Sequence, residues 1–317
     1  MRKTCPPPAF VAALLSASIC WSICGPASAD ARSDAFSAYQ KGDYATALTA
    51  MTALAQKGDV QAQYNVGAMY NNGLGVEVDH KRASTWLAKA AKAGNAFAQV
   101  DLAALYESGQ GVPLNYAEAI RLYRLAAKQN SPNAEVGLAA LYEQGLGAPK
   151  DYTAAMTWYR AAADKGSAEA QYAIGRLYAN GRGMTPDLGQ AAAWYRKAAE
   201  QGNDSAQLNL AALYYDGQGV AKDGAEAIKW FRMAAQAGNG HAQFDLAAVY
   251  AQGDGAPQDL PRAVVWFNAA AATLKGNEAK AAQDNASEVA KHLTHDQVAQ
   301  AQALAHDCKT GNYQRCE

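Results

Sequence analysis

The chain has 317 residues, of which half are hydrophobic, and its formal net charge is −1. This apolar content can supply a continuous core, and the near-neutral balance without a basic tract argues against an electrostatic nucleic-acid binder. Length alone allows one or two compact domains, but a strict internal repeat predicts a single elongated array.

Residues 1–29 have the pattern of a secretory signal peptide. Arg2 and Lys3 precede an uncharged apolar stretch, and Ala-Ser-Ala at 27–29 supplies the small residues of a cleavage site after Ala29. An uncleaved anchor is the alternative, although the apolar run is shorter than the about 20 residues of a spanning helix. We expect a periplasmic or secreted protein with no transmembrane segment in the mature chain.

Removal of the signal peptide would leave two cysteines, Cys308 and Cys316, in the C-terminal tail. An even number of cysteines in an exported protein indicates a disulfide. We therefore predict a bond between these two residues that closes a small loop.

Residues 30–58 predict a helical hairpin that caps the array. Tyr39 is followed by a short Gly42-Asp43 turn and then by the apolar spacing of a second helix. The segment lacks the glycine-rich loop of the later repeats. Atypical terminal segments are expected where a repeat array ends against water.

Residues 59–274 consist of six copies of a 36-residue segment. In the fourth copy the landmarks are Tyr178, Gly181, Gly183, Trp194 and Ala198, and shifts of 36 residues find equivalents of each. A strict period in this range is the signature of stacked helical repeats. The tyrosine, for example, recurs as Tyr70, Tyr106, Tyr142, Tyr214 and Tyr250.

Each copy predicts two helices, A and B, and a side chain that caps the start of each. A glycine or, once, Asn130 precedes each helix A, because either residue tolerates the left-handed conformation that ends a helix. The helix-A caps are Asp59, Asn95, Ser131, Ser167, Asn203 and Asn239, and the helix-B caps are Asp79, Asn115, Asp151, Asp187, Asp223 and Asp259.

The first turn of helix B contains predicted capping boxes in three repeats, completed by Glu118, Gln190 and Glu226. The acidic loops before these helices raise the alternative of calcium binding. Each loop offers one carboxylate, whereas calcium takes about 6–8 oxygen ligands. We therefore expect helix caps and no metal.

Helix B carries a tryptophan beside alanines in one register. Large and small side chains at this spacing allow neighbouring helices to approach closely, so we expect core packing. An aromatic cage for a ligand is the alternative. The residues are Trp86, Trp158, Trp194, Trp230 and Trp266, with Leu122 in the second repeat.

Residues 275–317 predict C-terminal capping helices and the cysteine-containing tail. Thr294 and Gln297 form a capping box before the last helix. His292, His295 and His306 could be considered as metal ligands, but they lack nearby acids or cysteines in zinc spacing. Solvated histidines at helix ends are the expected outcome.

The repeated pattern resembles the Sel1-like repeat family, a relative of tetratricopeptide repeats, over roughly residues 35–306. The resemblance implies an all-α, right-handed α-solenoid of antiparallel helix pairs that acts as a protein-binding scaffold without a cofactor. Exported bacterial members are linked to envelope assembly, regulation and host contact. Some cysteine-rich members are associated with penicillin binding, but these repeats contain no cysteine pairs.

The face of helix A opposite the core is the predicted partner-binding groove. In the first repeat it comprises Gln61, Tyr64, Asn65, Ala68 and Asn71. Aromatic anchors beside small and polar residues suit a peptide or protein partner. Packing of position 64 between repeats is the alternative. The candidate residues are Tyr64, Asn65, Asp101, Tyr172, Arg176, Asn209, Phe244 and Asp245.

No nucleophile, zinc or phosphate-loop motif supports an enzyme. The glycine-rich segments lack the lysine and preceding strand of a nucleotide site, so we interpret them as repeat turns. A carbohydrate-binding envelope protein is the second possibility, because groove tyrosines could stack on sugars. A penicillin-binding or hydrolase-type enzyme is the remote one.

Overall fold

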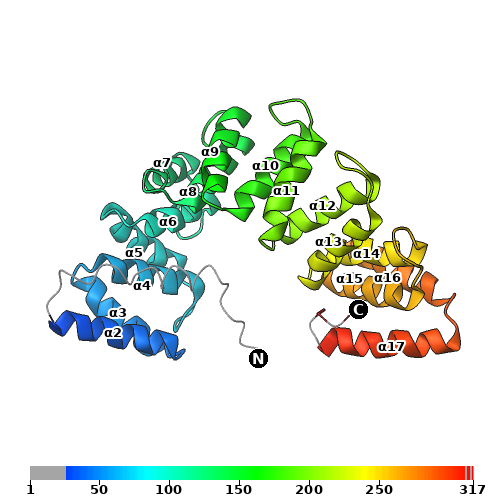
Figure 1. The fold of residues 1–317 in the computed structure, drawn as a ribbon. Helices are drawn as coiled ribbons and strands as arrows, with labels where there is room; N and C mark the ends of the chain where they lie inside the picture. The colour runs from blue at the N-terminus through cyan, green and yellow to red at the C-terminus, as the bar shows by residue number, and fades with distance from the viewer. Residues whose placement is uncertain (1–25, 311–312, 315, 317) are drawn as a thin grey trace. The chain divides into compact units, whose positions relative to one another are not determined.

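The computed structural model describes residues 26–310, 313, 314 and 316, and within these residues every regular element is an α-helix (Figure 1). Residues 1–25 of the predicted signal peptide lie outside the described residues. The chain divides into two compact units, residues 1–150 and 151–317. Within each unit the helices pack against their neighbours along the chain. The predicted all-α class is confirmed.

The first unit contains seven helices in its described part. They are α2 (Pro26–Gln40), α3 (Tyr44–Gln56), α4 (Val60–Asn72), α5 (His80–Lys92), α6 (Ala96–Ser108), α7 (Tyr116–Ala127) and α8 (Pro132–Gln144). The helices α4, α6 and α8 are helix A of repeats one to three, and α5 and α7 are helix B of repeats one and two.

The second unit begins with helix B of the third repeat and ends with two further helices. Its elements are α9 (Tyr152–Asp164), α10 (Ala168–Asn180), α11 (Leu188–Glu200), α12 (Asp204–Asp216), α13 (Gly224–Gln236), α14 (Gly240–Gln252), α15 (Leu260–Thr273), α16 (Gly276–Ala290) and α17 (His295–Thr310). Here α10, α12 and α14 are helix A.

The predicted caps are formed at both helices of every repeat. In the fourth repeat, Ser167 accepts a hydrogen bond from the amide of Ala170, and Asp187 accepts one from Gln190. Asn130 adopts φ 63°, so it replaces the glycine that occupies this position elsewhere. Local sequence therefore specifies the helix boundaries.

The capping boxes differ from the prediction in helix B. The side chains of Glu118 and Glu226 bond Arg121 and Lys229 within the first turn and, for Glu226, also the indole of Trp230. At the start of α17 the predicted box is complete, because Thr294 and Gln297 bond each other's backbone amides.

The second glycine of each A-to-B loop lies against the start of the preceding helix B. A Cβ on Gly219, whose φ is +71°, would stand 2.3 Å from the carbonyl carbon of Leu188. The loop thus covers the preceding repeat, and only glycine fits. The equivalent contacts join Gly75 to Tyr44, Gly111 to His80, Gly147 to Tyr116, Gly183 to Tyr152 and Gly255 to Gly224.

A buried glutamine near the start of helix A bonds the end of the preceding helix B. Gln207 donates from Nε2 to the carbonyl of Ala199 at 3.0 Å. This carbonyl also accepts from the amide of Gly202, so the glutamine supplies its second hydrogen bond. The other glutamines in this role are Gln63, Gln99, Gln171 and Gln243.

A second link joins helix B to the next helix A. Arg160 donates from Nη2 to the hydroxyl of Tyr178 at 3.0 Å, and Arg232 donates to Tyr250 at 2.8 Å. The repeated tyrosine therefore has a polar partner in the neighbouring repeat. The same pairing occurs in the first unit between Arg124 and Tyr142.

The helix-B tryptophans expected in the core differ in how deeply they are buried. Trp230 and Trp266 are buried, and Trp266 lies on α15, which also packs against α16 and α17. Trp86, Trp158 and Trp194 are half-buried. A lysine Nζ lies 4.0 Å from the ring of Trp194. Trp86 nevertheless packs against the hydrophobic core of the first unit, as expected.

Candidate partner-binding surface

The predicted groove residues share one side of helix A, which we call the helix-A face. It consists of positions 61, 64, 65, 68 and 71 of the first repeat and their equivalents at 36-residue spacing. The helix-A face is less buried than the opposite side, which carries the repeated core alanines and leucines. Each unit contributes its own part of this face.

The structure buries Tyr64 to 6% exposure. The other seven predicted site residues are half-buried: Asn65, Asp101, Tyr172, Arg176, Asn209, Phe244 and Asp245. Most of the predicted residues therefore retain some accessible surface.

In the first unit, Tyr64 is a junction between two repeats. Its ring packs against Phe97 of α6 with centroids 5.8 Å apart, and its hydroxyl donates a hydrogen bond to Asp101. Asn65 accepts a bond of 3.1 Å from Gln61 within α4. The packing alternative for position 64 therefore applies at Tyr64, while its neighbours stay accessible.

The carboxyl group of Asp101 is held in a low-polarity setting. Burial raises the pKa of Asp101 to about 6, and the hydrogen bond from Tyr64 acts in the opposite direction. Burial and the adjacent carboxylate both raise the pKa of Tyr64 above its ordinary value. The phenol therefore stays protonated and acts as the donor.

In the second unit, Tyr172 has an equivalent position but a different environment. Its ring lies 5.8 Å from that of Tyr195 on α11, and its hydroxyl accepts a 3.5 Å bond from Asn209 on the next helix A. Burial, and then Tyr172, raise the pKa of Tyr195 to about 12, while the cation of Arg176 lowers it. The structure thus brings together Tyr172, Arg176 and Asn209.

The last helix A presents Phe244 and Asp245. The ring of Phe244 meets Phe267 of α15 edge to face, with centroids 5.2 Å apart. Burial raises the pKa of Asp245, and the charge of His241 lowers it. This aromatic residue is therefore supported by its own repeat, unlike Tyr64.

One exposed aromatic residue of this face was not predicted from the sequence. Phe97 is 43% exposed, although it is a large hydrophobic residue. It is the equivalent of Gln61, and the remaining equivalents are Asn133, Glu169, Ser205 and His241. A comparison of position 61 across the repeats would have identified Phe97 as the apolar exception.

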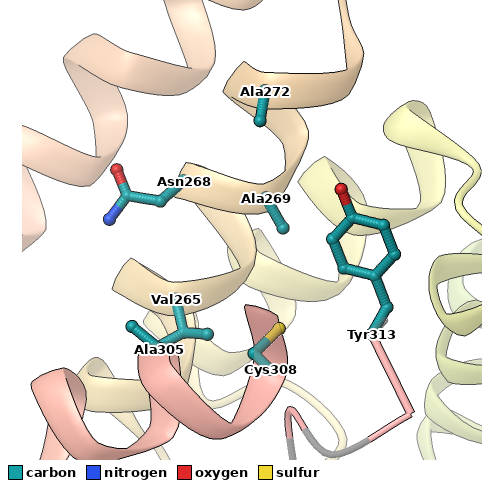
Figure 2. Close-up of a pocket in the computed structure, with 7 residues that line it drawn as sticks. All are labelled: Val265, Asn268, Ala269, Ala272, Ala305, Cys308 and Tyr313. Atoms are coloured by element: carbon teal, nitrogen blue, oxygen red, sulfur yellow. The ribbon is translucent and has the colours of Figure 1, made fainter. Parts of the chain in front are cut away.

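A pocket of about 390 Å³ lies between α15 and the C-terminal segment (Figure 2). Figure 2 shows Asn268 and Tyr313 on opposite sides of an aliphatic lining. The other lining residues are Val265, Ala269, Ala272, Ala305 and Cys308. Cys308 and Cys316 are both buried and are joined by a disulfide, which holds the segment bearing Tyr313 against the end of α17.

Within the described residues, no group of His, Cys, Asp and Glu side chains could hold a metal ion. None of the described helices combines the length and apolar character needed to cross a membrane.

Comparisons with known proteins give one consistent result. The Sel1 repeat model matches six consecutive segments, 60–95, 96–131, 132–167, 168–203, 204–239 and 240–272. The crystal structure of a Sel1 repeat protein from Oxalobacter formigenes is similar, with 34% identity and a TM-score of 0.68, over 76% of this chain and 96% of that one.

A second solved structure extends the similarity over more of this chain. It is c5321, a protective antigen present in uropathogenic Escherichia coli strains that displays an SLR fold. It shares 29% identity with a TM-score of 0.50, over 90% of this chain and 70% of that one. The comparison with curated proteins gave no match. The matches confirm the predicted α-solenoid, and the chain belongs to the Sel1 repeat family.

Proposed function

We propose that this chain is an exported scaffold that binds a protein or peptide partner through the helix-A face. Sel1 repeats generally mediate protein–protein interaction and are generally non-catalytic. The proposal adds the surface and the location to this family property. A role in envelope assembly, regulation or host contact would follow from export.

The observation that carries the proposal is the exposure of Phe97. A phenylalanine that is 43% exposed keeps apolar surface in water, and its ring is held in place by Tyr64. Aromatic residues with fixed orientation are common anchors of binding sites, because they gain contact area without losing much conformational freedom. Asp101 supplies a carboxylate beside this pair.

The second unit supports the same assignment through residues that depart from the repeat. Position 176 is arginine, whereas its equivalents are Ala68, Ala104, Ala140, Ala212 and Ala248. The repeated residues are used by the fold, so a difference between repeats at an accessible position is where partner specificity can arise. Arg176 adds a cation beside Tyr172 on this part of the surface.

Site-specific photocrosslinking tests the surface. A photoreactive residue at position 97, introduced into the chain in the cells that export it, should form an adduct with a discrete polypeptide. The same residue at position 229, on exposed Lys229 of helix B, is the matched control. Equal adducts at both positions would reject the helix-A face, and an adduct whose added mass is removed by glycosidase would favour the carbohydrate alternative.

Affinity provides the second measurement. Once the adduct is identified, Phe97→Ala should weaken its binding at least tenfold, which is the effect expected of an anchor residue. The exposed position predicts little change in the melting temperature. Unchanged affinity would remove Phe97 from the site.

Export is tested separately by N-terminal sequencing of the mature protein from fractionated cells. We expect the chain to begin at Asp30 outside the cytoplasm. An intact N-terminus in a membrane fraction would favour the anchor alternative.

A further inference from the structure

On the repeat helices of the first unit, the charges are divided between the A and B helices, while acidic Glu77 and Asp79 lie in the loop before α5. The A helices α4, α6 and α8 carry Asp101, Glu107, Glu135 and Glu143 and no lysine or arginine. The B helices α5 and α7 have the opposite balance, with Glu118 as their one acidic residue. Their basic residues are Lys81, Arg82, Lys89, Lys92, Arg121 and Arg124, all exposed.

The cationic character is concentrated on α5. Its buried side consists of Ala83, Ser84, Leu87, Ala90 and Ala91, which pack into the first unit. Lys81, Lys89 and Lys92 project from the other side and form no ion pair among the residues that the structure describes. Their charges are therefore available to an external anion.

Two apolar side chains lie at the edge of this cationic surface. Val78 directly precedes the cap of α5 and is 55% exposed, and Leu114 directly precedes the cap of α7 and is 56% exposed. These are the most exposed of the large hydrophobic residues in the described chain. Both side chains therefore keep apolar surface in contact with water.

The fold brings Leu114 to α5. The loop that contains Leu114 lies on the first turn of α5, because a Cβ on Gly111 would stand 2.2 Å from the carbonyl of His80. Ser84 also donates a hydrogen bond of 3.5 Å to the carbonyl of Gly111. The loop of Leu114 is therefore fixed against the end of α5 that carries Lys81.

Trp86 adds an amphipathic ring to this surface. It is half-buried, and Nζ of Lys89 lies 4.0 Å from its ring centroid. Lysine beside tryptophan and aliphatic side chains also occurs on helices that lie at membrane surfaces. The lysines meet the headgroups, and the apolar side chains enter the boundary between headgroups and acyl chains.

We propose that the outer surface of α5, with Val78 and Leu114 at its edge, is a docking surface for an anionic phospholipid bilayer. The charge complementarity selects anionic headgroups, and the two exposed aliphatic side chains favour a bilayer over a soluble polyanion. The attachment is peripheral and leaves the helix-A face unused. It is therefore independent of the proposed partner-binding function.

Vesicle co-sedimentation of the full mature chain tests the proposal. Vesicles of phosphatidylcholine with about one third phosphatidylglycerol should bind the protein, and vesicles of pure phosphatidylcholine should not. Binding should fall steeply between about 0.05 and 0.5 M salt, since exposed charges are screened. Each lysine near an anionic membrane contributes about fivefold in partitioning, so Lys81→Glu/Lys89→Glu/Lys92→Glu should lower binding more than a hundredfold.

A matched control separates the surface from net charge. Lys275→Glu/Lys280→Glu/Lys291→Glu makes the same charge change at exposed positions of the second unit and should bind like the wild type. Lys81→Arg/Lys89→Arg/Lys92→Arg should also bind normally. Circular dichroism confirms that each variant is folded.

Val78→Ser/Leu114→Ser tests the choice of a bilayer. This variant keeps every charge and should partition several-fold more weakly into anionic vesicles, while its binding to soluble polyphosphate is unchanged. Wild-type vesicle binding by the serine variant would overturn the bilayer and assign the surface to a soluble polyanion. Absence of wild-type binding to anionic vesicles, or equal loss in the α5 and control charge reversals, would overturn the surface itself.

Discussion

Gln201 donates a hydrogen bond of 2.8 Å from Nε2 to Oε1 of Gln171, whose own amide donates to the carbonyl of Ala163. The two glutamines therefore connect the end of α11, through α10, to the end of α9. The same relay occurs from Gln129 through Gln99 to Ala91, and from Thr273 through Gln243 to Ala235. It is formed in alternate repeats.

The fifth repeat lacks the residue that donates to the buried glutamine, which suggests a stabilising substitution. Position 237 is alanine, and the buried Oε1 of Gln207 has no hydrogen-bond partner among the described residues. Ala237→Gln should complete the relay and raise the free energy of unfolding by about 1 kcal/mol. Urea denaturation gives the measurement, with Gln201→Ala as the opposite change. If Ala237→Gln raises neither the free energy of unfolding nor the urea midpoint, the unpaired oxygen of Gln207 does not lower stability.

Substitution of a glycine in an A-to-B loop should destabilise the fold more than substitution of a glycine in the turn between helix B and the next helix A. Gly219→Ala combines a left-handed residue with a Cβ that meets the backbone of Leu188, so we expect a loss of more than about 2 kcal/mol. Gly238 also has positive φ, at +92°, but a Cβ added there would meet no atom of the described chain within 4 Å. Gly238→Ala should cost only about 1 kcal/mol. Similar losses in thermal denaturation of the two variants would contradict a role for the inter-repeat contact.

The buried carboxyl of Asp101 should make stability depend on pH. Its folded pKa of about 6 lies above the value of about 3.9 for an unfolded aspartate. The folded state therefore binds more protons in this interval, and the contribution of Asp101 to stability falls as pH rises from about 4 to about 6. Asp101→Asn removes this loss while Oδ1 can still accept from Tyr64.

The measurement is the free energy of unfolding of both proteins from pH 4 to pH 8. As pH rises through this range, the free energy of unfolding of Asp101→Asn should increase by roughly 1–3 kcal/mol relative to that of wild type. Asp43→Asn is the control. Hydrogen bonds from Thr46 lower the pKa of Asp43, so its ionised form favours the folded state and this variant should be less stable than wild type. A difference between wild type and Asp101→Asn that is constant with pH would refute the assignment.

The tryptophans of helix B should contribute different amounts to the free energy of unfolding. Trp266 is fully buried, so Trp266→Ala should cost about 3–5 kcal/mol. Trp194 is half-buried beneath Lys197, and the same change there should cost about 1–2 kcal/mol. Chemical denaturation of both variants decides the matter. Equal losses would show that residual exposure does not limit the contribution of Trp194.

The contrast between these residues shows what the sequence could predict. The caps at Ser167 and Asp187 depend on side chains that act within three residues, so local spacing was sufficient. Burial of a tryptophan depends on what covers its helix, and α15 differs from α11 because α17 packs against it in addition to the two neighbouring helices. The repeat made Trp194 and Trp266 look equivalent, although their surroundings are not.

The candidate surface was predicted less completely for the same reason. Its location on helix A followed from periodicity, but the bond between Tyr64 and Asp101 spans two repeats and required the stacking geometry. The charge division between α5 and the A helices of the first unit was also hidden, because the near-neutral total averages over opposite faces. Phe97 could have been found from the sequence by aligning position 61.

The contact between Gly219 and Leu188 has an evolutionary consequence. Each loop fits the helix that starts thirty-one residues earlier, and the same fit recurs at every copy within a unit. Recombination between copies that duplicates or deletes one whole period would keep loops and helices matched. An insertion of any other length in a loop would break the match. Lineages of such a chain can therefore vary in repeat number while loop length stays fixed.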